Sequence, residues 1–75
     1  MGDLRKEFGN RLRFAREMRG LSQAQLGKRA DMDPSQIAHI EGGSRLPGAE
    51  NLAGLAKALL VSADYLLGLS TKIER

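Results

Sequence analysis

The chain has 75 residues, a net charge of +3 and no cysteine. A chain of this length holds one domain with a small core, and without cysteine it has neither a disulfide framework nor a thiolate metal site. No apolar run approaches the roughly 20 residues of a membrane-spanning helix, and the first residues do not resemble a signal peptide. We therefore expect one soluble, cytoplasmic domain over residues 1–75, with no second catalytic or ligand-sensing domain.

The positive charge is concentrated in the first 45 residues. From Arg5 to Arg45, nine Lys and Arg residues stand against five Asp and Glu, whereas from Leu46 to Arg75 three stand against three. A polyanionic partner fits this excess, although ordinary soluble surfaces often carry a surplus of the same size. Charge alone leaves both interpretations open.

Apolar residues recur at spacings of three and four, without a sustained spacing of two, so the sequence predicts an all-α fold of five helices. The first helix is expected from about Leu4 to Arg19, because Gly20 can end it in the left-handed conformation. Its buried stripe is predicted to comprise Leu4, Phe8, Leu12 and Ala15.

Two helix-start signals stand eleven residues apart within residues 22–42, which is the pattern of a helix-turn-helix. Ser22 can cap the second helix, and Gln25 can complete a capping box with it. Asp33 and Gln36 repeat this arrangement at the start of the third helix. Glycines at positions 42 and 43 mark its end.

The second and third helices should form a rigid elbow, because apolar residues on both can bury a shared surface. Gly27 allows the two backbones to approach closely, and Asp31 in the turn tolerates a left-handed conformation better than most residues. The shared surface is predicted to comprise Leu26, Ala30, Met32, Ile37 and Ile40.

The remainder of the chain predicts two more helices. The fourth is expected from about Gly48 to Leu60, and Ser62 can cap a short fifth helix that stops at Gly68. Residues 69–75 form a tail that is expected to fray. The core positions of the fourth helix are predicted to be Leu52, Leu55, Ala56 and Leu59.

The outward face of the third helix is short. With Ile37 and Ile40 turned inward, a helical wheel places small or hydrogen-bonding residues on the opposite side, namely Ser35, Ala38, His39 and Gly42. No carboxylate lies among them. Such a face suits a groove between two rows of phosphates and can contact base edges.

Several stretches together carry a specific resemblance: residues 13–23, Leu26, Ile37, residues 40–47 and residues 61–68. Through them the chain resembles the small Cro/phage-repressor-type helix-turn-helix regulators of the Xre family. The resemblance covers nearly the whole sequence and implies a compact five-helix, lambda-repressor-like DNA-binding domain. It also implies binding to a pseudo-palindromic DNA operator, usually as a homodimer, with repression as the outcome.

The resemblance implies phosphate contacts from Gln23, at the positive end of the second helix, and from Arg45 after the third helix. The alternatives are a simple helix-start amide for Gln23 and a solvated side chain for Arg45. Ser22, Ser44 and Arg16 are further candidates for phosphate contact.

Ser35 and His39 are the main candidates for contacts with bases, with Gln36 on the flank. Pro34, where many relatives have a polar residue, and Ala38 can offer only apolar contacts, for example to a thymine methyl group. A metal site at His39 is not expected, because the chain has no cysteine and no second histidine.

Arg16 and Glu41 correspond to a pair that relatives join as a partly buried ion pair between the first helix and the end of the third. This pair should orient the third helix, and removing one partner would leave the other uncompensated.

The sequence thus favours a sequence-specific double-stranded DNA-binding regulator that is not an enzyme and takes no cofactor or small-molecule ligand. The alternatives are a protein-interaction module with the same fold, a restriction-modification controller and an antitoxin-type autoregulator. The location of a dimer interface stays open. Phe14 and Met18 are expected to pack on the C-terminal helices, but they could instead form that interface, as could Leu66, Leu67, Leu69 and Ile73.

Overall fold

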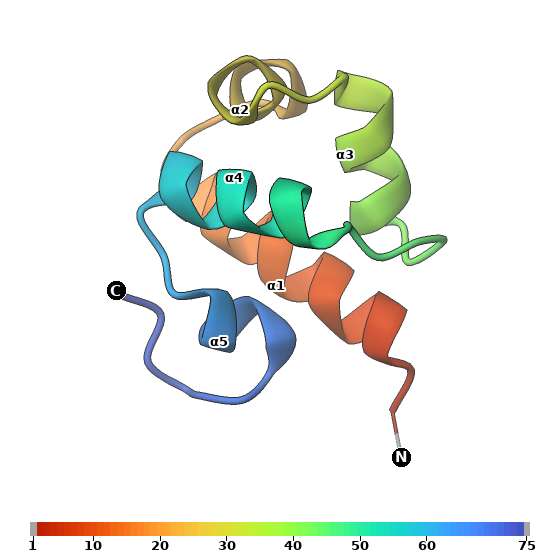
Figure 1. Ribbon diagram of the computed structural model, residues 1–75, viewed down its shortest axis with the longest axis vertical. Helices are drawn as coiled ribbons and strands as arrows, with labels where there is room; N and C mark the ends of the chain where they lie inside the picture. The colour runs from red at the N-terminus through yellow and green to blue at the C-terminus, as the bar shows by residue number, and fades with distance from the viewer. Residues whose placement is uncertain (1, 75) are drawn as a thin grey trace.

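The computed structural model describes residues 2–74, which form five α-helices joined by short connections (Figure 1). The helices are α1 (Leu4–Met18), α2 (Gln23–Ala30), α3 (Pro34–Glu41), α4 (Ala49–Leu59) and α5 (Ala63–Leu67). Their ends agree with the predicted ends to within one or two residues. The predicted all-α, five-helix architecture is therefore confirmed.

The helix starts are set by local side-chain caps. Ser22 Oγ accepts a hydrogen bond of 3.0 Å from the Gln25 N–H, and Gln25 Oε1 accepts one of 2.8 Å from the Ser22 N–H. Asp33 and Gln36 form the second capping box, in which Gln36 Oε1 accepts from the Asp33 N–H at 2.9 Å. Both predicted boxes are confirmed, and they fix where α2 and α3 begin.

The turn between α2 and α3 depends on the backbone conformation of Asp31 and on the absence of a side chain at Gly27. Asp31 adopts the left-handed conformation, with φ 57° and ψ 47°, as predicted. At Gly27 a Cβ atom would lie 2.5 Å from the carbonyl oxygen of Met32, so only glycine permits this close approach. Met32 itself is buried and joins the core.

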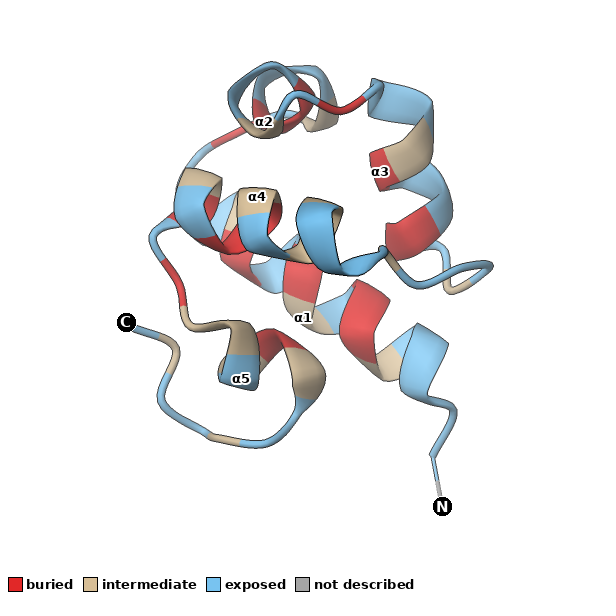
Figure 2. Cartoon of the chain, in the orientation of Figure 1, coloured by how far each residue is buried: buried red, intermediate tan, exposed pale blue. Residues whose placement is uncertain are grey.

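One hydrophobic core lies where the inner faces of the helices meet (Figure 2). In this core α1 packs against α3 and α5, while α2 packs against α3 and α4. Its largest fully buried side chains are Phe8, Leu12, Leu26, Ile37, Ile40, Leu55, Leu59, Val61 and Leu66. This packing holds α2 and α3 as one rigid unit on a platform of the other helices.

Three apolar residues predicted to be buried are exposed instead. Leu4 is 47% exposed, because the first turn of α1 extends beyond the other helices (Figure 1). Phe14 is 57% and Met18 48% exposed, so the prediction that they pack on the C-terminal helices is wrong. Phe14 lies two residues from the buried Leu12, a rotation of about 200° that carries it to the outer side of α1.

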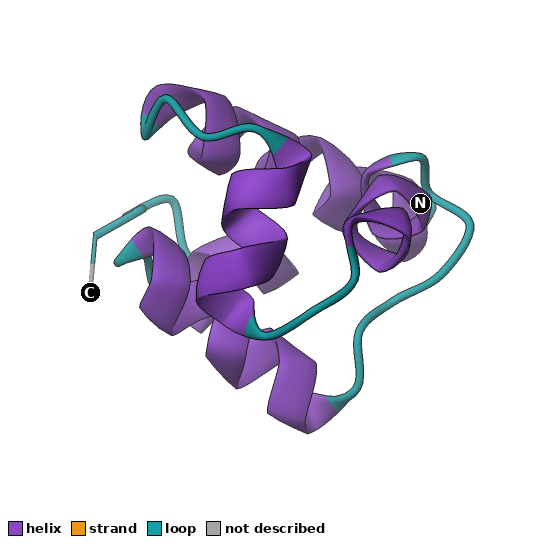
Figure 3. Ribbon diagram, turned by 90° about the horizontal axis from the view of Figure 1, so that it is seen from above, coloured by secondary structure: helices purple, strands orange, loops and turns teal. Residues whose placement is uncertain are grey.

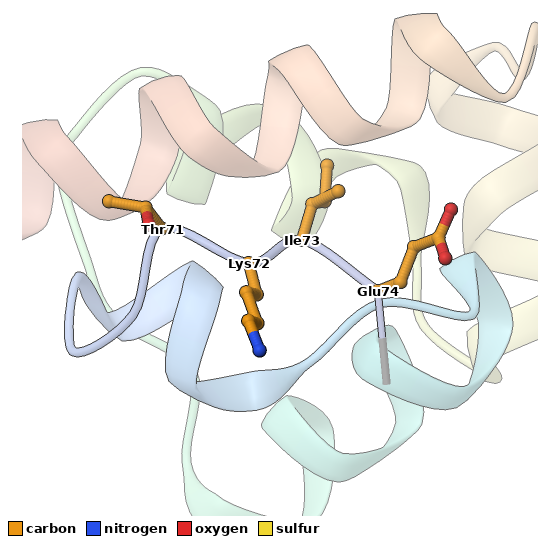
Figure 4. A pocket seen from close by; sticks show the side chains of 4 residues that line it. All are labelled: Thr71, Lys72, Ile73 and Glu74. Carbon is orange, nitrogen blue, oxygen red and sulfur yellow. The ribbon is translucent and has the colours of Figure 1, made fainter.

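The C-terminal tail was expected to fray, but residues 70–74 return to the body of the domain. The Ser62 N–H donates to the Ile73 carbonyl at 2.7 Å, and Val61 and Glu74 form an isolated antiparallel bridge. The side chain of Ile73 is partly buried and points toward α1, as Figure 4 shows. An open hollow beside this segment is lined by Thr71, Lys72, Ile73 and Glu74 (Figure 4).

Across residues 2–74, no helix has both the length and the apolar character needed to cross a membrane.

Candidate nucleic-acid interface

The helix α3 lies at the edge of the molecule and is seen nearly along its axis in Figure 3. Its inner side chains, Ile37 and Ile40, are buried. Its outer surface consists of the exposed residues Pro34, Ser35, Ala38 and His39, with Gln36 half-buried on the flank. Of the five residues proposed from the sequence to contact bases, the structure therefore places four on the exposed outer face of α3 and Gln36 at its edge.

A hydrogen-bonded cluster at the start of α3 involves Asp33 and Ser35. Asp33 Oδ1 accepts from the Ser35 N–H at 2.9 Å and from Ser35 Oγ at 2.8 Å. These hydrogen bonds, first the backbone one and then the hydroxyl one, hold the pKa of Asp33 below its usual value. Asp33 is therefore a carboxylate at neutral pH, and its role is to cap the helix.

His39 and Ser44 form hydrogen bonds along the outer side and the end of α3. The Nδ1 atom of His39 lies 2.9 Å from the Ser35 carbonyl oxygen, one helical turn earlier. Ser44 donates to the His39 carbonyl from its hydroxyl at 2.9 Å and from its N–H at 3.0 Å. Ser44 thus caps the end of α3, and the exposed Arg45 follows it directly in the loop.

Arg16 and Glu41 form the ion pair that the resemblance implied. Arg16 Nε donates to Glu41 Oε2 at 2.6 Å, and Arg16 Nη2 donates to Glu41 Oε1 at 3.0 Å. Hydrogen bonding to Glu41 raises the pKa of Arg16, and desolvation opposes part of this increase. Arg16 Nη1 also donates to the Leu21 carbonyl at 2.7 Å, so one guanidinium joins α1, the start of α2 and the end of α3.

Glu41 has two further partners that the sequence analysis did not predict. Gln23 Nε2 donates to Glu41 Oε1 at 3.1 Å, and Arg13 Nε lies 3.6 Å from the same oxygen. Gln23 is separated from Glu41 by 18 residues, so no local spacing could reveal this contact. The guanidinium groups of Arg13 and Arg16 both lie against the single carboxylate of Glu41. These three side chains therefore carry a net positive charge, beside Gln23 at the start of α2.

Two more arginines of α1 have structural roles that the sequence analysis missed. Arg19 donates to the carbonyls of Leu59 at 2.8 Å and Leu60 at 3.2 Å, which caps the end of α4. The Arg11 guanidinium packs over Gly68, where a Cβ atom would lie 2.8 Å from Arg11 Nη1. Arg19 therefore stabilises the end of α4, whereas Arg11 lies against the end of α5 with its buried Nη1 atom making no hydrogen bond.

Among residues 2–74, no group of three His, Cys, Asp or Glu side chains is placed to hold a metal ion. The C-terminal segment, whose residues 71–74 line the hollow, lies on the opposite side of the molecule from α3 (Figure 1). The surface of α3 and its flanks is thus the candidate site.

Comparison with known proteins agrees with this architecture. Residues 9–70 match the model of a family described as a helix-turn-helix domain. Over 60 residues, which are 80% of this chain, the sequence is 41% identical to the repressor protein C2 of Salmonella phage P22. The chain spans 28% of the length of that repressor.

Two solved structures are similar over most of the chain. The P22 c2 repressor in complex with a synthetic operator has a TM-score of 0.80 and 38% identity, with 84% of this chain and 96% of that chain covered. The restriction-modification controller protein C.AhdI from Aeromonas hydrophila has a TM-score of 0.78 and 36% identity, with 81% and 92% covered. The predicted resemblance to phage-repressor-type regulators is confirmed. The chain belongs to the helix-turn-helix domain family.

Proposed function

We propose that the chain is a sequence-specific double-stranded DNA-binding transcriptional regulator, and more specifically a repressor that acts in the cytoplasm. The observation that carries this proposal is the outer face of α3, which is exposed and free of carboxylates in residues 34–40. The similarity of the chain to the P22 c2 repressor, solved in complex with an operator, supports the same function. A regulator of this type uses neither a catalytic site nor a cofactor.

In this proposal α3 enters the major groove, which is wide enough to admit a helix. Ser35, Gln36 and His39 contact base edges, because their polar atoms lie on the exposed face and its flank. Pro34 and Ala38 can meet thymine methyl groups but offer no side-chain hydrogen bond. The apolar part of this face is small, which favours DNA over a protein partner.

The phosphates on one side of the groove would meet the start of α2. The unpaired N–H groups and the positive end of a helix favour an anion there. Gln23 uses one amide hydrogen on Glu41 and keeps the second for a phosphate, and Ser22 lies beside it. All three guanidinium nitrogens of Arg16 donate hydrogen bonds within the protein. We therefore assign Arg16 mainly to holding α1 against the end of α3, and only secondarily to phosphate contact.

The phosphates on the other side would meet the loop after α3. Arg45 is exposed there and follows Ser44 directly. The Ser44 hydroxyl hydrogen is used on the His39 carbonyl, so Ser44 positions the loop and Arg45 supplies the positive charge.

We further propose a homodimer on a pseudo-palindromic operator with half-sites about 34–36 Å apart, one turn of DNA. Leu66 is fully buried and cannot contribute to the interface considered from the sequence. Of the other residues considered from the sequence, Leu69, Phe14 and Met18 are exposed and are the available candidates, whereas Leu67 and Ile73 are partly buried.

The test is binding-site selection from a pool of random duplexes, followed by affinity measurements over a range of salt concentrations. We expect a symmetric motif, and we expect log affinity to fall with log salt with a slope of about −0.9 per phosphate contacted. A chain that enriches no motif and shows no salt dependence would overturn the proposal.

A restriction-modification controller is the second candidate function. The observation in its favour is the similarity to C.AhdI, of which 92% is covered by this chain. Both functions require operator binding, so the positions of the selected sites relative to restriction and modification genes would separate them.

A further inference from the structure

We propose that hydrogen bonds within α3 and to its N-cap residue Asp33 fix the hydrogen-bond polarity of its side chains, that is, whether each side chain offers DNA a donor or an acceptor. His39 and Ser35 present acceptors, whereas Gln36 presents a donor. This inference rests on the proposed function, because it states which base atoms the same surface can recognise.

The polarity of His39 follows from its contact with the backbone. The Nδ1 atom lies 2.9 Å from the Ser35 carbonyl oxygen. A carbonyl oxygen can only accept, so Nδ1 must carry the proton of the neutral imidazole. The other ring nitrogen, Nε2, then has a free lone pair. Neutral His39 therefore offers DNA an acceptor at Nε2.

The polarity of Ser35 follows from its contact with the capping carboxylate. The hydroxyl group has a single hydrogen, and Ser35 Oγ donates it to Asp33 Oδ1 at 2.8 Å. The pKa of Asp33 is lowered, so this group stays ionised at neutral pH and continues to accept. Ser35 Oγ is left with lone pairs, and it too offers DNA an acceptor.

Gln36 has the opposite polarity because of the capping box. Its Oε1 atom accepts from the Asp33 N–H at 2.9 Å, so the carbonyl end of the side chain is held at the start of the helix. The amide nitrogen retains two hydrogens for other partners. Gln36 is thus a natural internal control, since it lies on the same helix and offers a donor.

These polarities select different base atoms. In the major groove the hydrogen-bond donors are the amino groups of adenine (N6) and cytosine (N4), while N7 and O6 of guanine, N7 of adenine and O4 of thymine accept. Ser35 and His39 are four residues apart and therefore neighbours on one helix face. We infer that this face recognises base amino groups, and that Gln36 recognises a purine N7 or another acceptor beside them.

The first experiment measures the tautomer of His39 in the free protein at a pH where imidazole is neutral. The chain contains a single histidine, so long-range nitrogen–proton correlation NMR needs no further assignment. We expect the proton predominantly on Nδ1. A proton predominantly on Nε2 would overturn the inference for His39, whatever the protein binds.

The second experiment changes single functional groups in a selected operator. Comparison of the wild type with His39→Ala identifies the base pair that His39 contacts. Removal of the amino group from that pair should weaken wild-type binding at least about fivefold, whereas a deaza-purine without N7 should have little effect. Neither base modification should further weaken the binding of the His39→Ala variant.

Gln36→Ala provides the matched control. At the base pair that it identifies, removal of N7 or another acceptor should weaken binding and removal of the amino group should not. The inference is overturned if His39 proves sensitive to loss of N7 and insensitive to loss of the amino group, while operator binding itself persists. Failure to select any operator would overturn the proposed function and the base contacts with it, and the NMR measurement would remain as a separate test of the helix.

Discussion

Among residues 2–74, Glu41 is the buried charged side chain, with 3% of its surface exposed. A carboxylate at such a position is tolerated only when its lone pairs are occupied, and here Arg16 and Gln23 donate to it while Arg13 lies nearby. Glu41 is the last residue of α3, so the group that neutralises α1 arginines also holds the end of the proposed recognition helix.

Glu41→Ala should lower the free energy of unfolding by about 3 kcal/mol or more, because the Arg16 side chain, which is 13% exposed, loses both hydrogen bonds to Glu41 and its counter-charge and keeps the one to the Leu21 carbonyl. Urea denaturation measures the change, with Glu74→Ala as a control at an exposed carboxylate. If the Glu41 variant unfolds at the same urea concentration as the parent, the ion pair does not brace the fold.

Asp33 should contribute to the pH dependence of stability. Its pKa in the folded state is lowered by hydrogen bonds from Ser35, so its contribution is present above the unfolded-state pKa of about 3.9 and is lost as pH falls through the folded-state value. Asp33→Asn retains a capping side chain without this titration. We expect a flatter decline of stability below about pH 4 in the variant, measured by denaturation at a series of pH values. Identical acid profiles would contradict this assignment.

At the scale of elements, the sequence predicted the helix caps, which depend on neighbours three residues apart. Ser22 with Gln25 and Asp33 with Gln36 were found from spacing alone, because caps are local. The contacts between helices that it missed join residues distant in sequence: Gln23 with Glu41, and Arg19 with the end of α4. Each of these pairs joins two different helices, so the residue types and their local spacing alone do not reveal it.

The candidate site likewise has features that the sequence predicts and features that it does not. Which residues of α3 face outward follows from helix periodicity, and the structure agrees. The hydrogen-bond states of Ser35 and His39 could not be predicted, because they depend on side-chain conformation and not on spacing.

The turn between α2 and α3 offers a direct test of backbone strain. Asp31→Gly should raise the free energy of unfolding by up to about 1 kcal/mol, because a non-glycine residue is disfavoured at φ 57°. The matched reverse change is Gly20→Ala, at φ +71° with nothing within 4 Å of the added Cβ atom, and it should be destabilising. Thermal denaturation of both variants measures the pair. A less stable Asp31→Gly variant would contradict the proposed strain.

At the scale of the whole molecule, the domain leaves large apolar side chains on its surface. A 75-residue chain has little interior, and here Phe14 and Met18 lie outside it while Phe8 is fully buried within it. The C-terminal segment compensates in part, since Ile73 returns to cover the core.

Phe14→Ser should therefore change the free energy of unfolding of the monomer by less than about 0.5 kcal/mol, as expected for an exposed site. Phe8→Ala, at a fully buried position, should cost about 3–5 kcal/mol. Chemical denaturation at low protein concentration measures both. A large loss of stability in the Phe14 variant would show that this residue is buried in the folded protein.

The central claim is that α3 recognises a DNA sequence, and the measurement that tests it most directly is the ratio of affinities for a selected operator and for a scrambled duplex at the same salt concentration. For the wild type we expect a ratio of about 1,000 or more, typical of specific regulators. The ratio should fall sharply in a Ser35→Ala/His39→Ala variant that remains folded. A wild-type ratio near one, with a folded protein, would contradict the account.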